Sequence, residues 1–280
     1  MTNPIAEPYV DNAEGDADSR YVEVDATPEG FVTVTINRRQ KQNAFDSEVI
    51  LALRETFETL GSQDGVRVVF LRGHGGVFSA GADLEWMREA IEHTEDDNRA
   101  DAMDLAQMIK NLHDIPALTV ALVEGGAYGG GVGLVAACDM AVASQDAVFA
   151  LSEVKLGLVA AVISPYVVAA IGPRKARRLM ATAETFGADV AREIGLVDEV
   201  VADGSALMVA RDRIAAAQLA CGPLAVAASK RLVDEVAGKH IDHGVLTHTA
   251  HVIAAARVSD EGQEGVRAFL ERRKPSWLES

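Results

Sequence analysis

The chain has 280 residues, of which 49% are hydrophobic and 24% are charged, as in an ordinary globular protein. This length suits one large domain, or one domain with an appendage, and can bury a core without disulfides or metals. The net charge of −16, with no segregated basic run and no sufficiently long apolar window, argues against nucleic acid and membrane partners.

The two ends of the chain differ in character. Residues 1–19 are acidic and contain prolines and a glycine, so we expect a disordered tail rather than a signal peptide. Residues 20–204 alternate between strand and helix patterns and predict an α/β core, whereas residues 205–280 show only helical patterns. Cys138 and Cys221 lie far apart in apolar stretches, which predicts buried free thiols and a cytoplasmic protein.

The elements of the core follow from apolar periodicity. Alternating residues predict a hairpin at 21–25 and 31–36, and Asp46 or Ser47 caps the next helix. Short apolar runs predict the remaining strands, at 66–71, 118–123, 140–143, 148–151 and 197–201. Further helices are expected at 103–112, 132–137, 165–171 and 174–180. The charged segment 88–101 predicts a solvated helix or a loop over a site.

Two of the strands run into turns of small residues that precede helices. The turns read FSAGADL, residues 78–84, and GGAYGGGVG, residues 125–133. Unpartnered N–H groups at a helix start can stabilise an oxygen that becomes negative during a reaction, and glycine permits close approach. The glycines fit neither a phosphate loop nor a dinucleotide fingerprint. Tight packing explains either turn alone equally well.

These turns belong to a longer set of motifs. The others are INRRQKQNAFD (36–46), FALSEVKLGLV (149–159), AREIGLVDEVV (191–201) and EGVRAFLERRKPSW (264–277). In this order the chain resembles the crotonase family, also called the enoyl-CoA hydratase/isomerase family, from about residue 21 to 278. The resemblance implies a crotonase-type α/β fold, a ββα spiral core with a C-terminal helical trimerisation region. It also implies an acyl-CoA substrate, no separate cofactor, and a homotrimer or homohexamer.

The resemblance assigns the chemistry to three residues. The N–H groups of Ala82 and Gly130 would bind the thioester oxygen, and Glu153 would be the catalytic glutamate. Apolar neighbours would raise the pKa of Glu153 into a range useful for proton transfer. Gly133 stands where typical hydratases carry a second glutamate, so the proton chemistry falls to Glu153 alone.

The resemblance also suggests substrate contacts, each with a structural alternative. Arg38 and Lys41 would meet the phosphates or adenine end of CoA, or lie in a solvated loop. Asp83 would line the site or cap a helix, and capping is favoured. Phe269 and Lys274 would reach a neighbouring subunit's CoA. In the structural alternative, Phe269 would lie in the core and Lys274 would face solvent. The remaining expected substrate contacts are Ala80, Leu84 and Gly129. Asp139 is expected to make a structural hydrogen bond. No metal site is expected.

The favoured function is hydration of the 2,3 double bond of a 2-enoyl-CoA. FSAGADLEWM, AYGGGVGLVAACDMA and LSEVKLGLVAAVISPYVV resemble methylglutaconyl-CoA hydratases of leucine and isoprenoid breakdown, except that Ala160 replaces an expected proline. They favour 3-methylglutaconyl-CoA or a related branched acyl-CoA, closely followed by short-chain substrates. The alternatives are a Δ3,Δ2-enoyl-CoA isomerase, which works with one glutamate, and a non-enzymatic acyl-CoA or RNA-binding homologue. The acidic charge argues against RNA.

Overall fold

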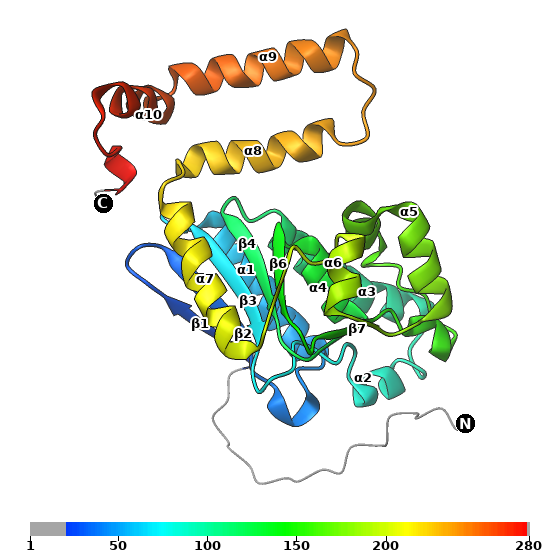
Figure 1. The fold of residues 1–280 in the computed structure, drawn as a ribbon. Coiled ribbons are helices and arrows are strands. Elements are labelled where there is room, and N and C mark those ends of the chain that lie inside the picture. The colour runs from blue at the N-terminus through cyan, green and yellow to red at the C-terminus, as the bar shows by residue number, and fades with distance from the viewer. Residues whose placement is uncertain (1–20, 279–280) are drawn as a thin grey trace.

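The computed structural model describes residues 21–278, so the predicted acidic tail, residues 1–19, lies outside the described residues. A six-stranded sheet runs through the core in the order β1-β2-β3-β4-β6-β9 (Figure 1). Its strands are Val22–Ala26, Phe31–Ile36, Val68–Gly73, Leu118–Val123, Met140–Ser144 and Glu199–Val201. Strand β1 pairs antiparallel with β2, which confirms the predicted hairpin, and the other pairs are parallel.

The central strands β3, β4 and β6 are buried on both faces of the sheet, as parallel strands require. Along β3, Val69 and Leu71 join the cluster formed with α1 and α3, whereas Val68 and Phe70 join a second cluster with α7. This alternation follows from the two-residue period of a strand. On the first face lie α1 (Ser47–Ser62), capped by Asp46 as predicted, and α3 (Glu95–His113), capped by Thr94.

A smaller sheet holds the second glycine turn. Its strands are β5 (Gly126–Tyr128), β7 (Val148–Ala150) and β8 (Phe186–Gly187), in the order β5-β7-β8. The neighbouring helices are α2 (Leu84–Glu89), α4 (Gly130–Ala137), α5 (Ser164–Thr182) and α6 (Ala188–Ile194). The expected break between residues 171 and 174 is a kink at Gly172, whose φ is 77°. Strand β5 was not predicted, because it is only three residues long and lies within the glycine-rich turn.

The C-terminal helices divide into two parts. Helix α7 (Gly204–Leu219) covers the second face of the main sheet, whereas the next three helices project away from the core (Figure 1). These are α8 (Pro223–Val236), α9 (His243–Val258) and α10 (Asp260–Glu271), here called the C-terminal arm. Short 3₁₀ turns occupy Arg39–Lys41, Glu153–Leu156 and Ser276–Leu278.

One lysine ties the arm to the core. The Nζ atom of Lys230, on α8, lies 2.6 Å from Oδ2 of Asp139 and donates to the carbonyl oxygens of Ile115 and Ala117 at 2.7 and 2.8 Å. Asp139 also accepts from the N–H and hydroxyl of Thr119, at 2.8 and 2.9 Å. The structural role predicted for Asp139 is confirmed.

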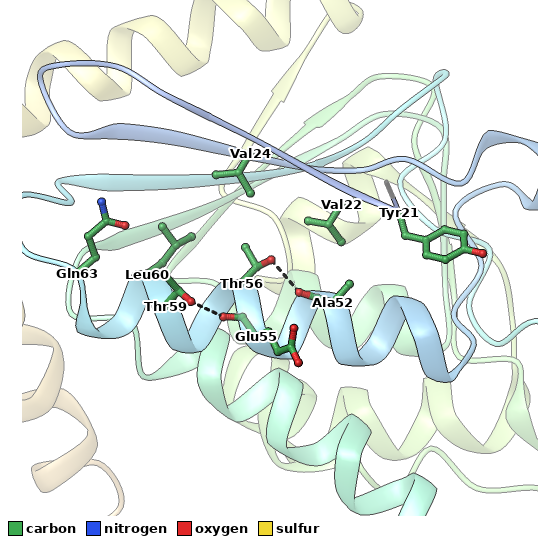
Figure 2. A pocket seen from close by; sticks show the side chains of 9 residues that line it. All are labelled: Tyr21, Val22, Val24, Ala52, Glu55, Thr56, Thr59, Leu60 and Gln63. Carbon is green, nitrogen blue, oxygen red and sulfur yellow. Dashed lines mark hydrogen bonds between the residues drawn. The ribbon is translucent and has the colours of Figure 1, made fainter. Parts of the chain in front are cut away.

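An open groove separates β1 from α1, and Val24, Thr56 and Leu60 are among its lining residues (Figure 2). None of the lining residues belongs to the glycine turns or to the segment of Glu153, so the groove is separate from the candidate site. Both cysteines are free; Cys138 is partly buried, whereas Cys221 is exposed. Its predicted burial was wrong, because it lies where the chain leaves α7 for the arm. Among the described residues, no helix is long and apolar enough to cross a membrane.

Candidate active site

The first glycine turn presents the N–H of Ala82. Phe45 donates its N–H to the carbonyl of Gly81 at 2.7 Å and accepts the N–H of Asp83 at 2.8 Å. These two bonds form a parallel bridge between Phe45 and Ala82. Because they flank Ala82 on the side of Phe45, the N–H of Ala82 itself points the other way. Within residues 21–278, this N–H has no hydrogen-bond acceptor.

The second turn presents the N–H of Gly130, the first residue of α4. Gly129 precedes it with a φ of 50°, a left-handed value that favours glycine. Its N–H donates to Ala150 on the neighbouring strand at 3.0 Å, which fixes the turn. The N–H of Gly130 lies in the first turn of a helix, where it has no partner within the helix. A second donor is therefore available.

The two turns touch each other. The N–H of Ser79 donates to the carbonyl of Gly126 at 3.0 Å, and the N–H of Tyr128 donates back to Ser79 at 2.9 Å. A Cβ added at Gly81, whose φ is 87°, would lie only 2.9 Å from the carbonyl oxygen of Tyr128. Glycine at position 81 therefore permits the close approach that brings the two donor-bearing turns together.

Glu153 lies beside the second turn. It begins the 3₁₀ turn after β7, and its Oε1 lies 3.1 Å from where a Cβ on Gly129 would stand. The other oxygen, Oε2, is buried and has no hydrogen-bond partner. Burial raises the pKa of Glu153 above its usual value of 4.5. Beside the turn that carries the Gly130 donor, the Glu153 carboxyl group thus has one oxygen, Oε2, without a hydrogen-bond partner and a pKa raised by burial.

Gly133, the position of the missing second glutamate, is closed by its surroundings. A Cβ there would lie 2.2 Å from Cγ2 and 2.8 Å from Cβ of Ile163, and 3.5 Å from Cδ1 of Ile109. Both isoleucines are fully buried or nearly so. The space is therefore filled with apolar atoms, and a carboxylate has no room at this position.

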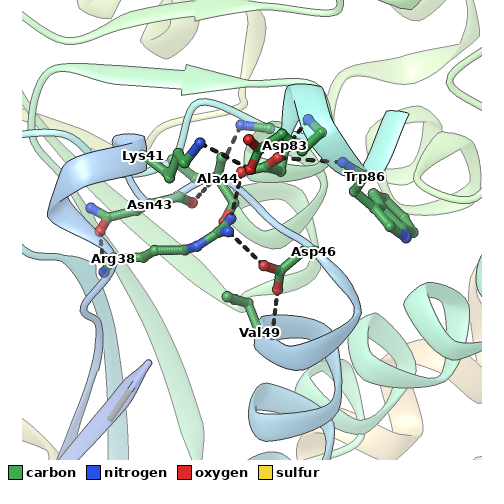
Figure 3. Close-up of polar contacts among 11 residues, drawn as sticks. Arg38, Lys41, Asn43, Ala44, Asp46, Val49, Asp83 and Trp86 are labelled. Carbon is green, nitrogen blue, oxygen red and sulfur yellow. Dashed lines mark hydrogen bonds and ion pairs between the residues drawn. The ribbon is translucent and has the colours of Figure 1, made fainter. Parts of the chain in front are cut away.

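Asp83 caps α2, as the structural alternative predicted. Its Oδ1 accepts the N–H groups of Glu85 and Trp86 at 2.7 and 3.4 Å (Figure 3). Burial opposes its ionisation, but these N–H groups and the Arg38 guanidinium outweigh burial and lower the pKa of Asp83. Arg38 contacts Oδ2 of both Asp83 and Asp46, at 2.8 and 2.6 Å. Its guanidinium is occupied by protein carboxylates, and the CoA contact stays a prediction.

The other predicted contacts near the first turn are more open. Lys41 lies 3.2 Å from Glu85, with both side chains exposed, so its ammonium is available to an incoming phosphate. Leu84 is 77% exposed, and the N–H of Ala80 donates to the carbonyl of Gln42 at 2.9 Å. The structure places these residues around the first turn, and their contacts with substrate stay predictions.

Phe269 and Lys274 lie elsewhere. Phe269 belongs to α10 and Lys274 follows it, on the projecting arm and apart from α4 and β7 (Figure 1). Phe269 is 82% exposed, so its alternative assignment to the core was wrong: only Ala268 of α10 is buried. A single chain does not bring these two residues to Glu153.

One residue that holds the first turn was given no role from the sequence. Asn43 is fully buried and donates its amide to the carbonyls of His74 and Val77 at 2.9 and 2.6 Å. Its own carbonyl accepts the hydroxyl of Ser79 at 2.9 Å, and its Oδ1 accepts the N–H of Arg38 at 3.0 Å. The signal was present, since Asn43 stands within the motif INRRQKQNAFD.

Comparison with known proteins shows which family this chain belongs to. The model of the Enoyl-CoA hydratase/isomerase family matches residues 26–280. The chain belongs to this family. A Thermus thermophilus protein named as an enoyl-CoA hydratase is 33% identical over 88% of this chain and 97% of the relative. A mitochondrial Delta(3,5)-Delta(2,4)-dienoyl-CoA isomerase of Dictyostelium discoideum is 28% identical over 92% and 91% of the two chains.

Solved structures of the family share the fold. The crystal structure of an enoyl-CoA hydratase from Shewanella pealeana superposes with a TM-score of 0.89 at 40% identity, covering 92% of this chain and 96% of that one. The α/β fold and family membership expected from the motifs are thereby confirmed. In the described part of the chain, no group of three or more His, Cys, Asp or Glu side chains could hold a metal ion.

Proposed function

We propose that the chain is an enoyl-CoA hydratase that adds water across the 2,3 double bond of a 2-enoyl-CoA. The observation that carries this proposal is the buried, unpartnered Oε2 of Glu153, next to the turn that presents the Gly130 N–H. A buried polar atom without a partner is rare in a native structure and calls for a function. A water molecule or a substrate proton would satisfy it.

The proposed reaction uses one carboxylate for both protons. Ionised Glu153 takes a proton from water as the oxygen attacks C3, and the π electrons move onto the thioester oxygen to give an enolate. The N–H groups of Ala82 and Gly130 stabilise that oxygen. Protonated Glu153 then returns a proton to C2, which regenerates the thioester carbonyl. Both new bonds form on one face of the substrate, so the addition is syn.

The proposed substrate is 3-methylglutaconyl-CoA or a related branched acyl-CoA. Its support is the likeness of three long motifs to methylglutaconyl-CoA hydratases, together with the small residue Gly133 at the position of the second glutamate. General short-chain 2-enoyl-CoAs are the next candidates.

An isomerase is the second candidate. One glutamate suffices to move a proton between C2 and C4 of an enoyl-CoA, and a dienoyl-CoA isomerase is among the relatives. A non-enzymatic acyl-CoA or RNA-binding role has less support. The net charge of −16 disfavours RNA, and a buried carboxyl without a partner would be costly in a mere scaffold.

A substrate panel tests the proposal. Purified protein is given 3-methylglutaconyl-CoA, crotonyl-CoA and a 3-enoyl-CoA separately, and absorbance of the conjugated enoyl thioester is followed with product mass. Loss of conjugation with a gain of one water supports the hydratase, and the fastest substrate identifies the acyl class. Gain of conjugation from the 3-enoyl-CoA without hydration of any 2-enoyl-CoA identifies an isomerase. Tight binding without turnover identifies the non-enzymatic alternative.

The pH dependence of hydration is expected to report on Glu153. The reaction starts from the carboxylate, so kcat/KM should fall as pH decreases through the pKa of Glu153 in the free enzyme. Burial raises this pKa above 4.5, so the loss should begin at a higher pH than for an exposed glutamate. A pH–rate profile of kcat/KM measures the inflection, and a flat profile down to pH 4.5 would contradict it.

We also propose that the protein assembles as a homotrimer or homohexamer. In a single chain the arm leaves many large apolar side chains exposed, more than an isolated soluble surface ordinarily carries. These include Leu224, Val233, Leu246, Ile253, Val258, Phe269 and Leu270. Neighbouring subunits would cover them, and Phe269 and Lys274 could then reach a second subunit's CoA. Light scattering should give three or six times the 29.7 kDa chain mass.

The cytoplasmic location stays a proposal that rests on the two free cysteines.

A further inference from the structure

We infer that Arg38 is a positioning residue for the Ala82 oxyanion donor. This inference rests on the proposed function, because it assumes that the Ala82 N–H binds the thioester oxygen. It assigns Arg38 a task other than the CoA phosphate contact suggested by its motif.

The Arg38 side chain has acceptors on the segment Ala44–Asp46 and on Asp83 of the first turn (Figure 3). Its NH1 donates to the carbonyl of Ala44 at 3.1 Å and to Oδ2 of Asp83 at 2.8 Å. Its NH2 lies 2.6 Å from Oδ2 of Asp46. The guanidinium thus bridges the segment Ala44–Asp46 and the residue that follows Ala82.

The same two segments carry the bridge that orients the donor. Phe45 lies between the two residues that Arg38 binds, and its N–H and carbonyl bond to Gly81 and Asp83 at 2.7 and 2.8 Å. Those two bonds turn the N–H of Ala82 away from Phe45 and leave it free. If the segments separate or slide, the bridge distorts and the donor rotates. Arg38 therefore acts on Ala82 through the backbone of its neighbours.

Each carboxylate in this arrangement also caps a helix. Oδ1 of Asp46 accepts the N–H of Val49 at the start of α1, at 2.9 Å, and Oδ1 of Asp83 accepts the N–H of Glu85 at the start of α2, at 2.7 Å. The cation therefore fixes the starts of both helices relative to each other. Only an arginine has a planar fork that can serve three acceptors at once.

The burial of the side chain separates this role from phosphate binding. The Arg38 side chain is 13% exposed and Asp83 is 2% exposed, so the pair interacts with little screening by solvent. The guanidinium also lies over the ring of Tyr21, with 5.8 Å between Cζ and the ring centroid. In contrast, Lys41 is 45% exposed and is a cation that a phosphate could reach.

The test separates donor geometry from CoA binding and from stability. Butyryl-CoA with a ¹³C-labelled carbonyl cannot be hydrated, and the infrared frequency of its carbonyl drops when two donors polarise it. This frequency, the Kd of unacylated CoA, kcat, KM and the melting temperature are measured for wild type and for Arg38→Gln and Arg38→Lys. Arg54→Gln is the matched control, because Arg54 pairs with one carboxylate, Asp104, away from the turns.

Arg38→Gln is expected to lose much of the carbonyl shift and about 10- to 100-fold in kcat, because a misplaced donor approaches the cost of a missing one. Its Kd for CoA should stay within about 2-fold of wild type. Arg38→Lys keeps a charge beside Asp83, so it should fold and recover part of both losses. The control should keep the wild-type frequency and kcat.

Other outcomes overturn the inference. A raised Kd for CoA with an unchanged carbonyl frequency would assign Arg38 to phosphate binding. A lowered melting temperature with unchanged frequency and kcat in the folded Arg38→Lys protein would leave it a purely structural role. If wild type itself shows neither a shifted carbonyl nor turnover, the proposed function fails, and the inference fails with it.

Discussion

Replacing Glu153 with glutamine is expected to lower kcat for hydration by about 1,000-fold, within the range that general acid–base groups contribute. Glutamine keeps the shape of the side chain but can neither take the proton from water nor return it to C2. The donors of Ala82 and Gly130 belong to the backbone and are unaffected, so the Kd of a saturated acyl-CoA should change by less than about 3-fold. Stopped-flow hydration assays and titration calorimetry measure the two quantities.

The stability of Glu153→Gln is expected to be equal to or higher than that of wild type, although its kcat falls. Burial raises the pKa of Glu153 in the folded chain, so the folded state binds this proton more tightly than the unfolded state does. Stability contributed by this group therefore falls as pH rises from the unfolded pKa through the folded one. At neutral pH, Glu153→Gln removes an ionised carboxylate that opposes folding, and its melting temperature should equal or exceed that of wild type.

A matched variant separates the chemistry from a general effect of lost charge. Glu199→Gln removes a glutamate whose partner is the exposed Arg213, and it should leave kcat unchanged. If Glu153→Gln retains turnover above about one tenth of wild type, Glu153 is not the acid–base group. A reduced melting temperature would contradict the burial argument instead.

Placing a glutamate at Gly133 is expected to cost most of the protein's stability rather than create a two-glutamate site. The new Cβ would meet Cγ2 of Ile163 at 2.2 Å, and overpacking of this kind typically costs 1–3 kcal/mol. Desolvating an unpaired carboxylate adds several kcal/mol more. The sum is comparable to the ~5–15 kcal/mol that holds a typical domain folded. Chemical denaturation of Gly133→Glu measures the loss.

The companion changes show whether Ile163 is the cause. Gly133→Ala with Ile163→Ala removes the 2.2 Å contact and leaves the one at 2.8 Å, so the double variant should be less destabilised than the sum of the single ones. Gly61→Glu is the control, because a Cβ at this helical glycine meets nothing within 4 Å. It should be neutral or slightly stabilising. Strict additivity at positions 133 and 163 would refute the steric account.

The sequence predicts the main elements of the core because their apolar periods are strong. The run Leu118–Val123 matches β4 at both ends, and the hairpin of β1 and β2 is placed within a residue. Strand β5 escapes prediction because Gly126 and its neighbours carry no strand signal, and its hydrogen bonds come from segments distant in the chain. Pairing of that kind is decided by tertiary contacts rather than local propensity.

The candidate site was likewise predictable from the sequence only in part. Motifs were enough to nominate Ala82, Gly130 and Glu153, since each stands in a recognisable segment. The sequence could not show that Ile163 fills the space beside Gly133, or that Arg38 is held by two carboxylates. Ile163 is 30 positions from Gly133, and Asp83 is 45 positions from Arg38. Spacing along the chain does not report these contacts, and a motif containing Arg38 suggests a ligand contact equally well.

Both proposed oxyanion donors belong to the main chain, and this has an evolutionary consequence. Codon changes that swap one ordinary side chain for another at Ala82 or Gly130 leave the N–H itself in place. A side-chain carboxylate such as that of Glu153 can be lost by a single base change from a glutamate codon to a glycine codon. Divergence can therefore alter proton chemistry while oxyanion stabilisation is inherited with the fold. This is consistent with a family whose name covers both hydratases and isomerases.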